Sequence, residues 1–233
     1  MLFSLLRQGY NDPKEMLFEI LLYFLALSLA FAGHEFSHAL AAYLLGDDTA
    51  KRMGRLTLNP LAHTDLRGVI FLILLGFGWG KPVPVNPNNL TKLKSRRISN
   101  IIVSLAGITA NLLIAFISAI VCSVIYRLGL AGQHVMVNLV LVFFSVWEQI
   151  NICLLVFNLI PIPPLDGFKV IEQLLPLKFR YSGFFKGYCH YAPMIFFAII
   201  LISAFSDYSI ISYAVAFVRV GMDICAMLVT SFI

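Results

Sequence analysis

The chain has 233 residues, of which 60% are hydrophobic and 12% charged, against roughly 45–50% and about 25% in ordinary soluble domains. This composition excludes a water-soluble globular protein. It predicts an all-α multi-pass membrane protein, because several uncharged runs approach the ~20 apolar residues that a spanning helix needs. The formal net charge is +5, but the basic residues flank apolar runs, so we expect a lipid bilayer as their partner and no nucleic acid.

Apolar runs predict about five transmembrane helices, over residues 16–45, 98–127, 137–160, 191–205 and 208–232. The first run is too long for the apolar part of a signal peptide, so we expect it to belong to the mature protein. We expect a single intramembrane domain over residues 1–233. Its core would cover residues 14–175, with additional C-terminal helices over residues 188–233.

A shorter apolar run over residues 69–75 follows the first predicted span. Glycines and the sequence Lys-Pro-Val-Pro-Val-Asn-Pro over residues 81–87 come after it. The run is too short to cross a bilayer and is bounded by Gly and Pro, which predicts a short membrane-dipping β-hairpin over about residues 69–85. Such backbone survives at membrane depth only when it is paired or lines a wet cavity, so the hairpin implies an internal aqueous pocket.

The basic residues are unevenly distributed along the chain. Of the 17 Lys and Arg residues, nine lie over residues 46–97 and four over residues 161–190. Positively charged loops stay on the cytoplasmic side of a membrane. The distribution therefore predicts two cytoplasmic segments and an external N-terminus, and five spans would then leave the C-terminus inside.

The sequence His34-Glu-Phe-Ser-His38 lies within the first predicted span, toward its cytoplasmic end. On an α-helix, positions i and i+4 share one face, so both imidazoles can bind one Zn²⁺ while Glu35 can reach the attacking water. Ionisable residues inside spans are costly and by default mark functional sites. The motif predicts a zinc hydrolase with Glu35 as general acid and base. The alternative is a polar cluster in a helix-packing interface.

A catalytic zinc ion needs a third protein ligand and one open position. The best candidate is Asp166, in the sequence Asn-Leu-Ile-Pro-Ile-Pro-Pro-Leu-Asp-Gly over residues 158–167. Its prolines end the preceding helix and force an extended chain, which could direct the carboxylate back toward His34 and His38. The alternative is an ordinary Asp-Gly turn at the membrane surface. Imidazoles must be neutral to bind zinc, so we expect activity to fall in mild acid.

Two asparagines in predicted spans, Asn111 and Asn158, are further candidates for catalysis. Either amide could donate a hydrogen bond to the oxyanion of a tetrahedral intermediate, and the alternative for Asn111 is a hydrogen bond between helices. We expect His63, in the basic loop, to order that loop or support the ligands rather than bind the metal. His134 and His190 lie at predicted span ends, where interfacial positions are expected.

The four cysteines lie far apart and show no CxxC spacing. This argues against a disulfide framework and against a thiolate metal site. We therefore expect buried free thiols at Cys122, Cys153, Cys189 and Cys225.

Taken together, these motifs resemble those of the site-2 proteases, which are intramembrane zinc metalloproteases. The match runs from about residue 33 to residue 167. The H-E-x-x-H motif and the Asn-x-x-Pro-x-Pro-x-x-Asp-Gly run are its most specific parts. Asn-Pro-Leu-x-His-x-Asp over residues 59–65 and Gly-x-x-x-Asn over residues 107–111 agree in order and position.

The resemblance implies that His34, His38 and Asp166 ligate one zinc ion per chain. It also implies that Glu35 is the general acid and base and that Asn158 is an oxyanion partner. The segment over residues 69–85 would be the family's membrane-dipping β-hairpin, and an extended substrate could add to it as a strand. No PDZ-like or nucleotide-sensing domain is recognisable, so the resemblance is to a minimal form.

These observations predict a protease that cuts transmembrane segments of membrane proteins or membrane-retained peptides, in a bacterial plasma membrane with the active site toward the cytoplasm. Two alternatives belong to other classes. A catalytically silent homologue could bind membrane helices as a scaffold or chaperone, although such a relative is expected to lack Glu35 or a ligand. A metal transporter should carry further polar ligands along a path through the bilayer, and the predicted spans offer few.

Overall fold

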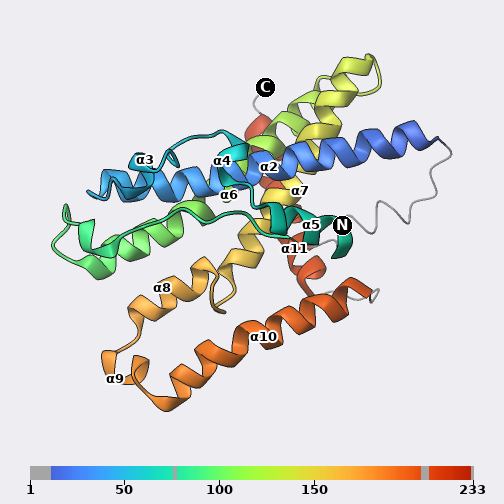
Figure 1. The fold of residues 1–233 in the computed structure, drawn as a ribbon. Coiled ribbons are helices and arrows are strands. Elements are labelled where there is room, and N and C mark those ends of the chain that lie inside the picture. The colour runs from blue at the N-terminus through green and yellow to red at the C-terminus, as the bar shows by residue number, and fades with distance from the viewer. Residues whose placement is uncertain (1–11, 76–77, 206–209, 232–233) are drawn as a thin grey trace. The chain divides into compact units, whose positions relative to one another are not determined.

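The computed structural model describes residues 12–75, 78–205 and 210–231, and all regular secondary structure among them is helical (Figure 1). Five helices exceed twenty residues: α2 (Pro13–Leu44), α6 (Arg96–Arg127), α7 (Val135–Leu159), α10 (Gly183–Phe205) and α11 (Ile210–Thr230). The short elements are α3 (Thr49–Arg52), α4 (Pro60–His63), α5 (Leu66–Leu75), the 3-10 helix η1 (Pro87–Asn89), α8 (Asp166–Leu174) and α9 (Leu177–Arg180).

Four helices in the described part of the chain are long and apolar enough to cross a membrane. They are Pro13–Leu44, Arg96–Arg127, Val135–Leu159 and Ser212–Thr230. This confirms a multi-pass membrane protein. We predicted five spans, and the structure has four candidate spans among the described residues. The expected span over residues 191–205 forms the second half of α10, which is not among these four helices. The expectation of an internal C-terminus depended on five spans, so it is not supported by the four spans found among the described residues.

The β-hairpin predicted over residues 69–85 is wrong as far as the structure describes that segment. Residues 66–75 form α5, and no strand occurs among residues 78–85. Asp65 explains the helix, because its Oδ1 accepts a hydrogen bond from the Arg67 N–H at 2.8 Å and so caps the first turn. Residues 76 and 77 lie outside the described residues. Pro82 and Pro84 keep residues 81–86 out of helix.

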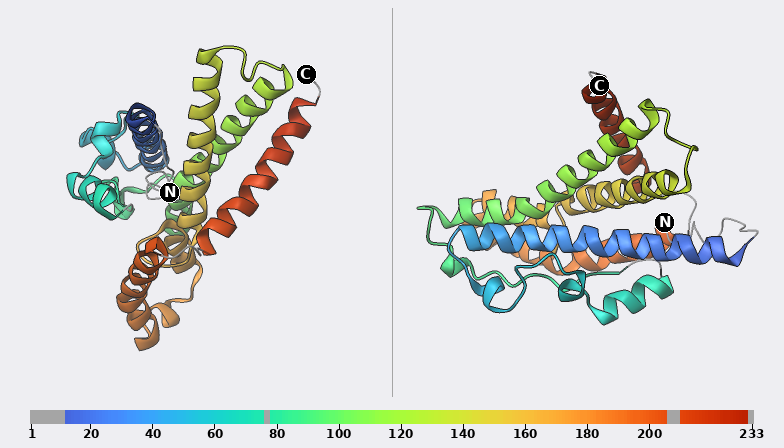
Figure 2. Two further views of the ribbon diagram at one scale, coloured as in Figure 1. Left: turned by 90° about the vertical axis from the view of Figure 1, so that its right-hand side faces the viewer. Right: turned by 90° about the horizontal axis from the view of Figure 1, so that it is seen from above.

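The chain forms two compact units. Unit 1 comprises Met1–Ala30, Asn111–Val156 and Ile210–Ile233, and unit 2 comprises Phe31–Ala110 and Phe157–Ser209. Figure 2 shows the helices from two further directions. A core cluster of unit 1 contains Tyr23, Ala26, Ala30 and Ile150, and one of unit 2 contains Ala42, Leu90 and Val103. The expectation of a single domain over residues 1–233 remains a prediction.

A buried carboxylate fastens the loops of unit 2 to the end of α2. Asp47 is fully buried, and its oxygens accept hydrogen bonds from Thr49 Oγ1 at 2.5 Å, from the Asn86 N–H at 2.6 Å and from Asn89 Nδ2 at 3.1 Å. Asn86 also caps η1 by accepting from the Asn88 N–H at 3.1 Å. Residues 86–89 are thereby attached to the turn that follows α2.

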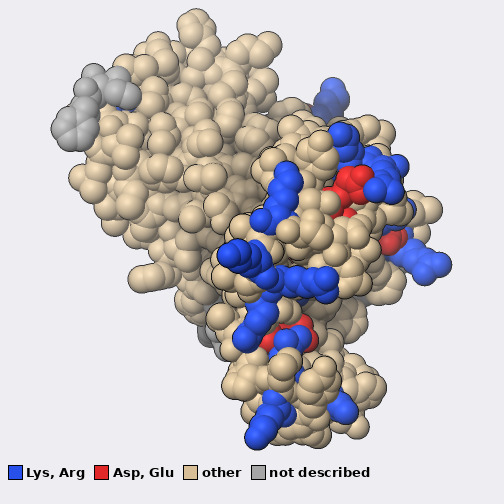
Figure 3. All heavy atoms as spheres, turned by 90° about the vertical axis from the view of Figure 1, so that its left-hand side faces the viewer, with Lys and Arg blue, Asp and Glu red and all other residues tan. Residues whose placement is uncertain are grey.

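Figure 3 shows many exposed Lys and Arg side chains close to one another. In unit 2 they come from the two segments that the sequence marked as basic, residues 46–97 and 161–190. Arg97 joins these segments, because its Nε donates to the Gln173 carbonyl at 2.8 Å and its Nη2 to the Leu175 carbonyl at 3.2 Å. Both segments therefore meet at the end of α8.

Candidate metal centre

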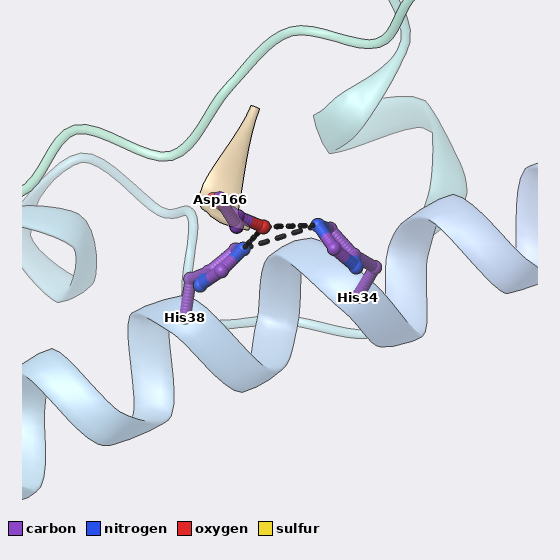
Figure 4. Close-up of side chains that lie close together, drawn as sticks. All are labelled: His34, His38 and Asp166. Atoms are coloured by element: carbon purple, nitrogen blue, oxygen red, sulfur yellow. Dashed lines mark hydrogen bonds and ion pairs between the residues drawn. The ribbon is translucent and has the colours of Figure 1, made fainter. Parts of the chain in front are cut away.

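His34, His38 and Asp166 come together in unit 2 from two helices far apart in the sequence (Figure 4). The Nε2 atoms of the two histidines lie 3.1 Å apart. Asp166 Oδ2 lies 3.1 Å from His34 Nε2 and 3.0 Å from His38 Nε2. All three residues are buried. A tetrahedral site with ligand bonds of 2.0–2.1 Å has edges of about 3.3 Å, so the three atoms are spaced as zinc ligands are.

Neighbouring groups favour the forms of these side chains that bind a cation, which are an imidazole with a free Nε2 and an ionised carboxylate. The Val103 carbonyl lies 2.7 Å from His38 Nδ1, and because a carbonyl only accepts, Nδ1 carries the proton and Nε2 of the neutral ring is left for metal. Burial by itself raises the pKa of Asp166. When the Nε2 atoms of His34 and His38 carry protons, their hydrogen bonds to the carboxylate, together with the charge of Lys169, outweigh burial and hold that pKa well below its ordinary value, and a bound cation takes the place of those protons. Lys169 Nζ lies 2.8 Å from Asp166 Oδ1.

Gly107 of α6 leaves space beside the imidazoles. A Cβ at this position would lie 2.5 Å from both His34 Cε1 and His38 Nε2, well inside van der Waals contact. Only glycine lets the backbone of α6 approach the two rings this closely. Two imidazoles and a carboxylate, with no side chain from α6 between them, fit a zinc ion.

Gly167 lets the chain that carries Asp166 pack against the end of α7. A Cβ on Gly167 would lie 2.5 Å from the Leu159 carbonyl oxygen and 2.9 Å from the Asn158 carbonyl oxygen. The start of α8 therefore lies directly beside the last residues of α7, and this packing sets the position of the Asp166 carboxylate.

Glu35 is half-buried on α2, between the two histidines in sequence. Its Oε2 accepts a hydrogen bond from the backbone N–H of Val83 at 2.8 Å. Val83 lies in the non-helical segment over residues 78–86. The segment predicted to be part of a hairpin thus contacts the candidate general base, although it is not a strand.

The two candidate asparagines belong to different units. Asn111 is fully buried in unit 1, where its Nδ2 donates to Asn151 Oδ1 at 2.8 Å, joining α6 to α7 as in the interhelical alternative. Asn158 is half-buried near the end of α7 in unit 2. The oxyanion role of either residue remains a prediction.

His63 is buried and lies where it can order its loop. Its Nε2 lies 2.8 Å from the Thr57 carbonyl, and its own carbonyl accepts from the Lys81 N–H at 2.8 Å. His134 and His190 are both exposed. The four cysteines are free, but only Cys122 is buried, Cys153 and Cys189 are half-buried and Cys225 is exposed, so the expectation of four buried thiols is wrong for three of them.

Sequence reasoning did not single out the polar cluster of unit 1. Glu148 of α7 is buried with its Oε1 4.0 Å from Arg219 Nε of α11. Arg219 Nη1 donates to Gln149 Oε1 at 2.6 Å. The sequence did contain a signal for this cluster, because Glu148 and Arg219 are charged residues within apolar helices, where charges are rare and by default mark functional sites.

Comparison with known proteins identifies the family. A family model described as peptidase family M50 matches residues 123–201. A protein of Bacillus subtilis (strain 168), named "Putative zinc metalloprotease YwhC", is 43% identical over 152 residues, which are 65% of this chain and 68% of that protein. No solved structure matches the chain.

More distant relatives carry a related name. "Putative zinc metalloprotease Rip2" of Mycolicibacterium smegmatis is 34% identical over 151 residues, or 61% of this chain, and the match spans about half (52%) of that protein. A protein of the same name from Mycobacterium tuberculosis (strain H37Rv) is 34% identical over 152 residues, with the same shares of both chains. With more than two thirds of a 43% identical relative covered, the chain belongs to peptidase family M50, the site-2 protease family of zinc metalloproteases.

Proposed function

We propose that this protein is an intramembrane zinc metalloprotease that hydrolyses peptide bonds in transmembrane segments of membrane proteins or in membrane-retained peptides. The observation that carries the proposal is the convergence of the ligating atoms of His34, His38 and Asp166 to within 3.1 Å of one another. Both histidines lie on a helix that is apolar enough to cross a membrane. The names of the relatives support zinc as the metal.

His34, His38 and Asp166 would hold the zinc ion, which when bound polarises the scissile carbonyl and lowers the pKa of water toward ~7. Glu35 accepts a proton from the attacking water as the water oxygen bonds to the carbonyl carbon. Glu35 then delivers this proton to the leaving nitrogen as the C–N bond breaks, which regenerates the carboxylate. Asn158 is the first candidate to donate a hydrogen bond to the oxyanion, a role typically worth ~3 kcal/mol in other hydrolases.

The substrate is bound in extended form beside the segment over residues 78–86. A helical substrate must first unwind, because its amides are shielded by their own hydrogen bonds. Pro82 and Pro84 carry no N–H, so an extended peptide could pair with this part of the segment only by donating its N–H groups to the carbonyl oxygens there. Contacts of this kind hold the backbone straight without demanding one side-chain sequence.

The active site lies toward the cytoplasmic side of a bacterial plasma membrane, with the N-terminus outside. Support comes from the basic segments over residues 46–97 and 161–190, which meet in the same unit as the candidate ligands. Positively charged segments of this kind remain on the cytoplasmic side. His38 lies only six residues before the end of α2, close to the first of these segments along the chain.

Two other functions fit the observations less well. A silent scaffold would bind membrane helices without needing a general base, yet Glu35 and the three ligands are all chemically competent. A metal transporter needs successive sites, whereas the described residues contain one group of three ligands that could hold a metal ion.

The test compares the wild type with Glu35→Gln in zinc-loaded protein reconstituted into liposomes. The probe is a tagged single-span membrane protein whose transmembrane segment contains helix-weakening glycines. Glu35→Gln keeps the shape of the side chain and removes its basicity, so we expect zinc content to be unchanged and cleavage to fall at least ~100-fold. Glu15→Gln is the matched control, because Glu15 is an exposed residue in the first turn of the same helix.

Equal cleavage by the wild type and Glu35→Gln would exclude the acid–base role. Binding of the probe by the wild type without any cleavage would instead favour the scaffold function.

A further inference from the structure

The non-helical segment before η1 is attached to unit 2 by three of its backbone N–H groups. The Lys81 N–H donates to the His63 carbonyl at 2.8 Å. The Val83 N–H donates to Glu35 Oε2 at 2.8 Å, and the Asn86 N–H donates to Asp47 Oδ2 at 2.6 Å. The first and third bonds hold the two ends of the segment, so the Val83 amide is presented to Glu35 from an anchored backbone.

Prolines on both sides of Val83 restrict what this amide can do. Pro82 and Pro84 have no N–H, so Val83 is the one residue from Pro82 to Pro84 that can donate to Glu35 through its backbone. A residue that precedes proline is also kept in the extended region of backbone conformation. The Pro-Val-Pro sequence therefore offers a single donor in a restricted orientation.

The contact divides the two oxygens of Glu35 between separate tasks. Oε2 is occupied by the Val83 amide, whereas Oε1 has no hydrogen-bond partner among the described residues. A hydrogen bond from a neutral N–H to a carboxylate is charge-assisted and stronger than one between neutral groups. It can therefore restrict the side-chain torsions of Glu35, which is only half-buried and is not enclosed by packing alone.

We propose that the backbone amide of Val83 is a positioning group for the general base. It holds the Glu35 carboxylate through Oε2 and leaves Oε1 to accept the proton of the attacking water and deliver it to the leaving nitrogen. This inference rests on the proposed proteolytic function. It assigns to the proline-rich segment a part in orienting the base, besides its proposed contact with substrate.

The competing explanation is that the contact only fastens the segment to α2. The bonds at His63 and Asp47 already provide that attachment at both ends of the segment. Loss of a fastening bond would loosen the segment and weaken substrate binding, which raises KM. Loss of a positioning bond would misorient the base while the substrate is bound, which lowers kcat.

The main test is Val83→Pro, which removes the N–H in a segment where the flanking prolines already favour extended backbone. We expect kcat to fall about 10- to 100-fold, from the loss of a charge-assisted bond, with KM, zinc content and melting temperature close to those of the wild type. Val83→Ala keeps the N–H, so its loss of kcat should be clearly smaller than that of Val83→Pro. Val85→Pro is the matched proline control within the same segment, because the Val85 N–H makes no hydrogen bond among the described residues, and its loss of kcat should be clearly smaller than that of Val83→Pro.

A second variant protects the test against misfolding of Val83→Pro. Incorporating the α-hydroxy analogue of valine at position 83 replaces the N–H by an oxygen and keeps the side chain, and it should lower kcat by a similar factor.

The outcomes separate this proposal from the proposed function. Unchanged kcat in the ester variant, equal losses in Val83→Pro and Val85→Pro, or a change confined to KM would each overturn the positioning role while leaving the protease intact. Absence of cleavage by the wild type would overturn the proposed function itself.

Discussion

Substituting Gly107 by alanine should remove zinc from the protein. The added Cβ would lie 2.5 Å from His34 Cε1 and from His38 Nε2, and 2.7 Å from His34 Nδ1. Ordinary van der Waals contact begins at 3.4 Å, so the rings or the backbone of α6 would have to separate by about 1 Å. His38 cannot simply turn away, because its Nδ1 is held 2.7 Å from the Val103 carbonyl.

Zinc sites do not tolerate a displacement of this size. Ligand distances in such sites stay within about 0.2 Å of their preferred values, and disturbing the groups that support the ligands typically costs 10- to 100-fold in metal affinity. We expect Gly107→Ala to lower the zinc affinity at least 10- to 100-fold, with a parallel loss of cleavage. The opposite result is expected if α6 has room for a methyl group, because alanine is up to ~1 kcal/mol more favourable than glycine inside a helix.

The assay measures zinc per chain by mass spectrometry after purification, zinc affinity by competition with a chelator, and the melting temperature in detergent. Gly187→Ala is the matched control, since Gly187 lies in helix α10 of the same unit and a Cβ there meets nothing within 4 Å. It should keep its zinc and melt at the wild-type temperature or higher. A Gly107→Ala protein with full zinc and raised stability would refute the close approach of α6 to the histidines.

Two further predictions concern the groups that position the site. Gly167→Ala should weaken zinc binding, because its Cβ would lie 2.5 Å from the Leu159 carbonyl oxygen and push away the start of α8 with Asp166; wild-type affinity in a zinc titration would contradict this. Asp47→Asn should lower the free energy of unfolding by about 1–3 kcal/mol at neutral pH, since its hydrogen-bonded carboxylate is lost. Burial raises the pKa of Asp47, but hydrogen bonds from Thr49 and from residues 86–89 outweigh it and hold that pKa below 3.8. The carboxylate therefore stabilises the fold fully at pH values above the ordinary pKa of aspartate, and this stabilisation is lost as the pH falls through the lowered pKa of Asp47. The difference in stability between the wild type and Asp47→Asn should shrink in strong acid. Denaturation at a series of pH values checks this, and a difference independent of pH would contradict it.

The local features of the candidate site could be read from the sequence because helix geometry is local. His34 and His38 share a face whenever residues 34–38 are helical, and an apolar run of this length predicts such a helix in a membrane.

The segment after His63 shows where local reasoning failed. A short apolar run bounded by Gly and Pro suits a strand or a short helix, and periodicity cannot decide between them. The cap at Asp65 decided for a helix. The contact between Val83 and Glu35 is present although the segment is not a strand, because this contact depends on where the segment lies and not on strand pairing.

The sequence alone determined the membrane environment, the pairing of His34 with His38 and the presence of a candidate general base, Glu35, between them, since each depends on composition or on spacing within one helix. Only the tertiary structure decided that Asp166, 128 residues beyond His38, reaches the same point in space. It alone also showed that Gly107 leaves room for the metal and that the Val83 amide reaches Glu35. These contacts join residues that no local periodicity relates, so they exist only once the chain has packed.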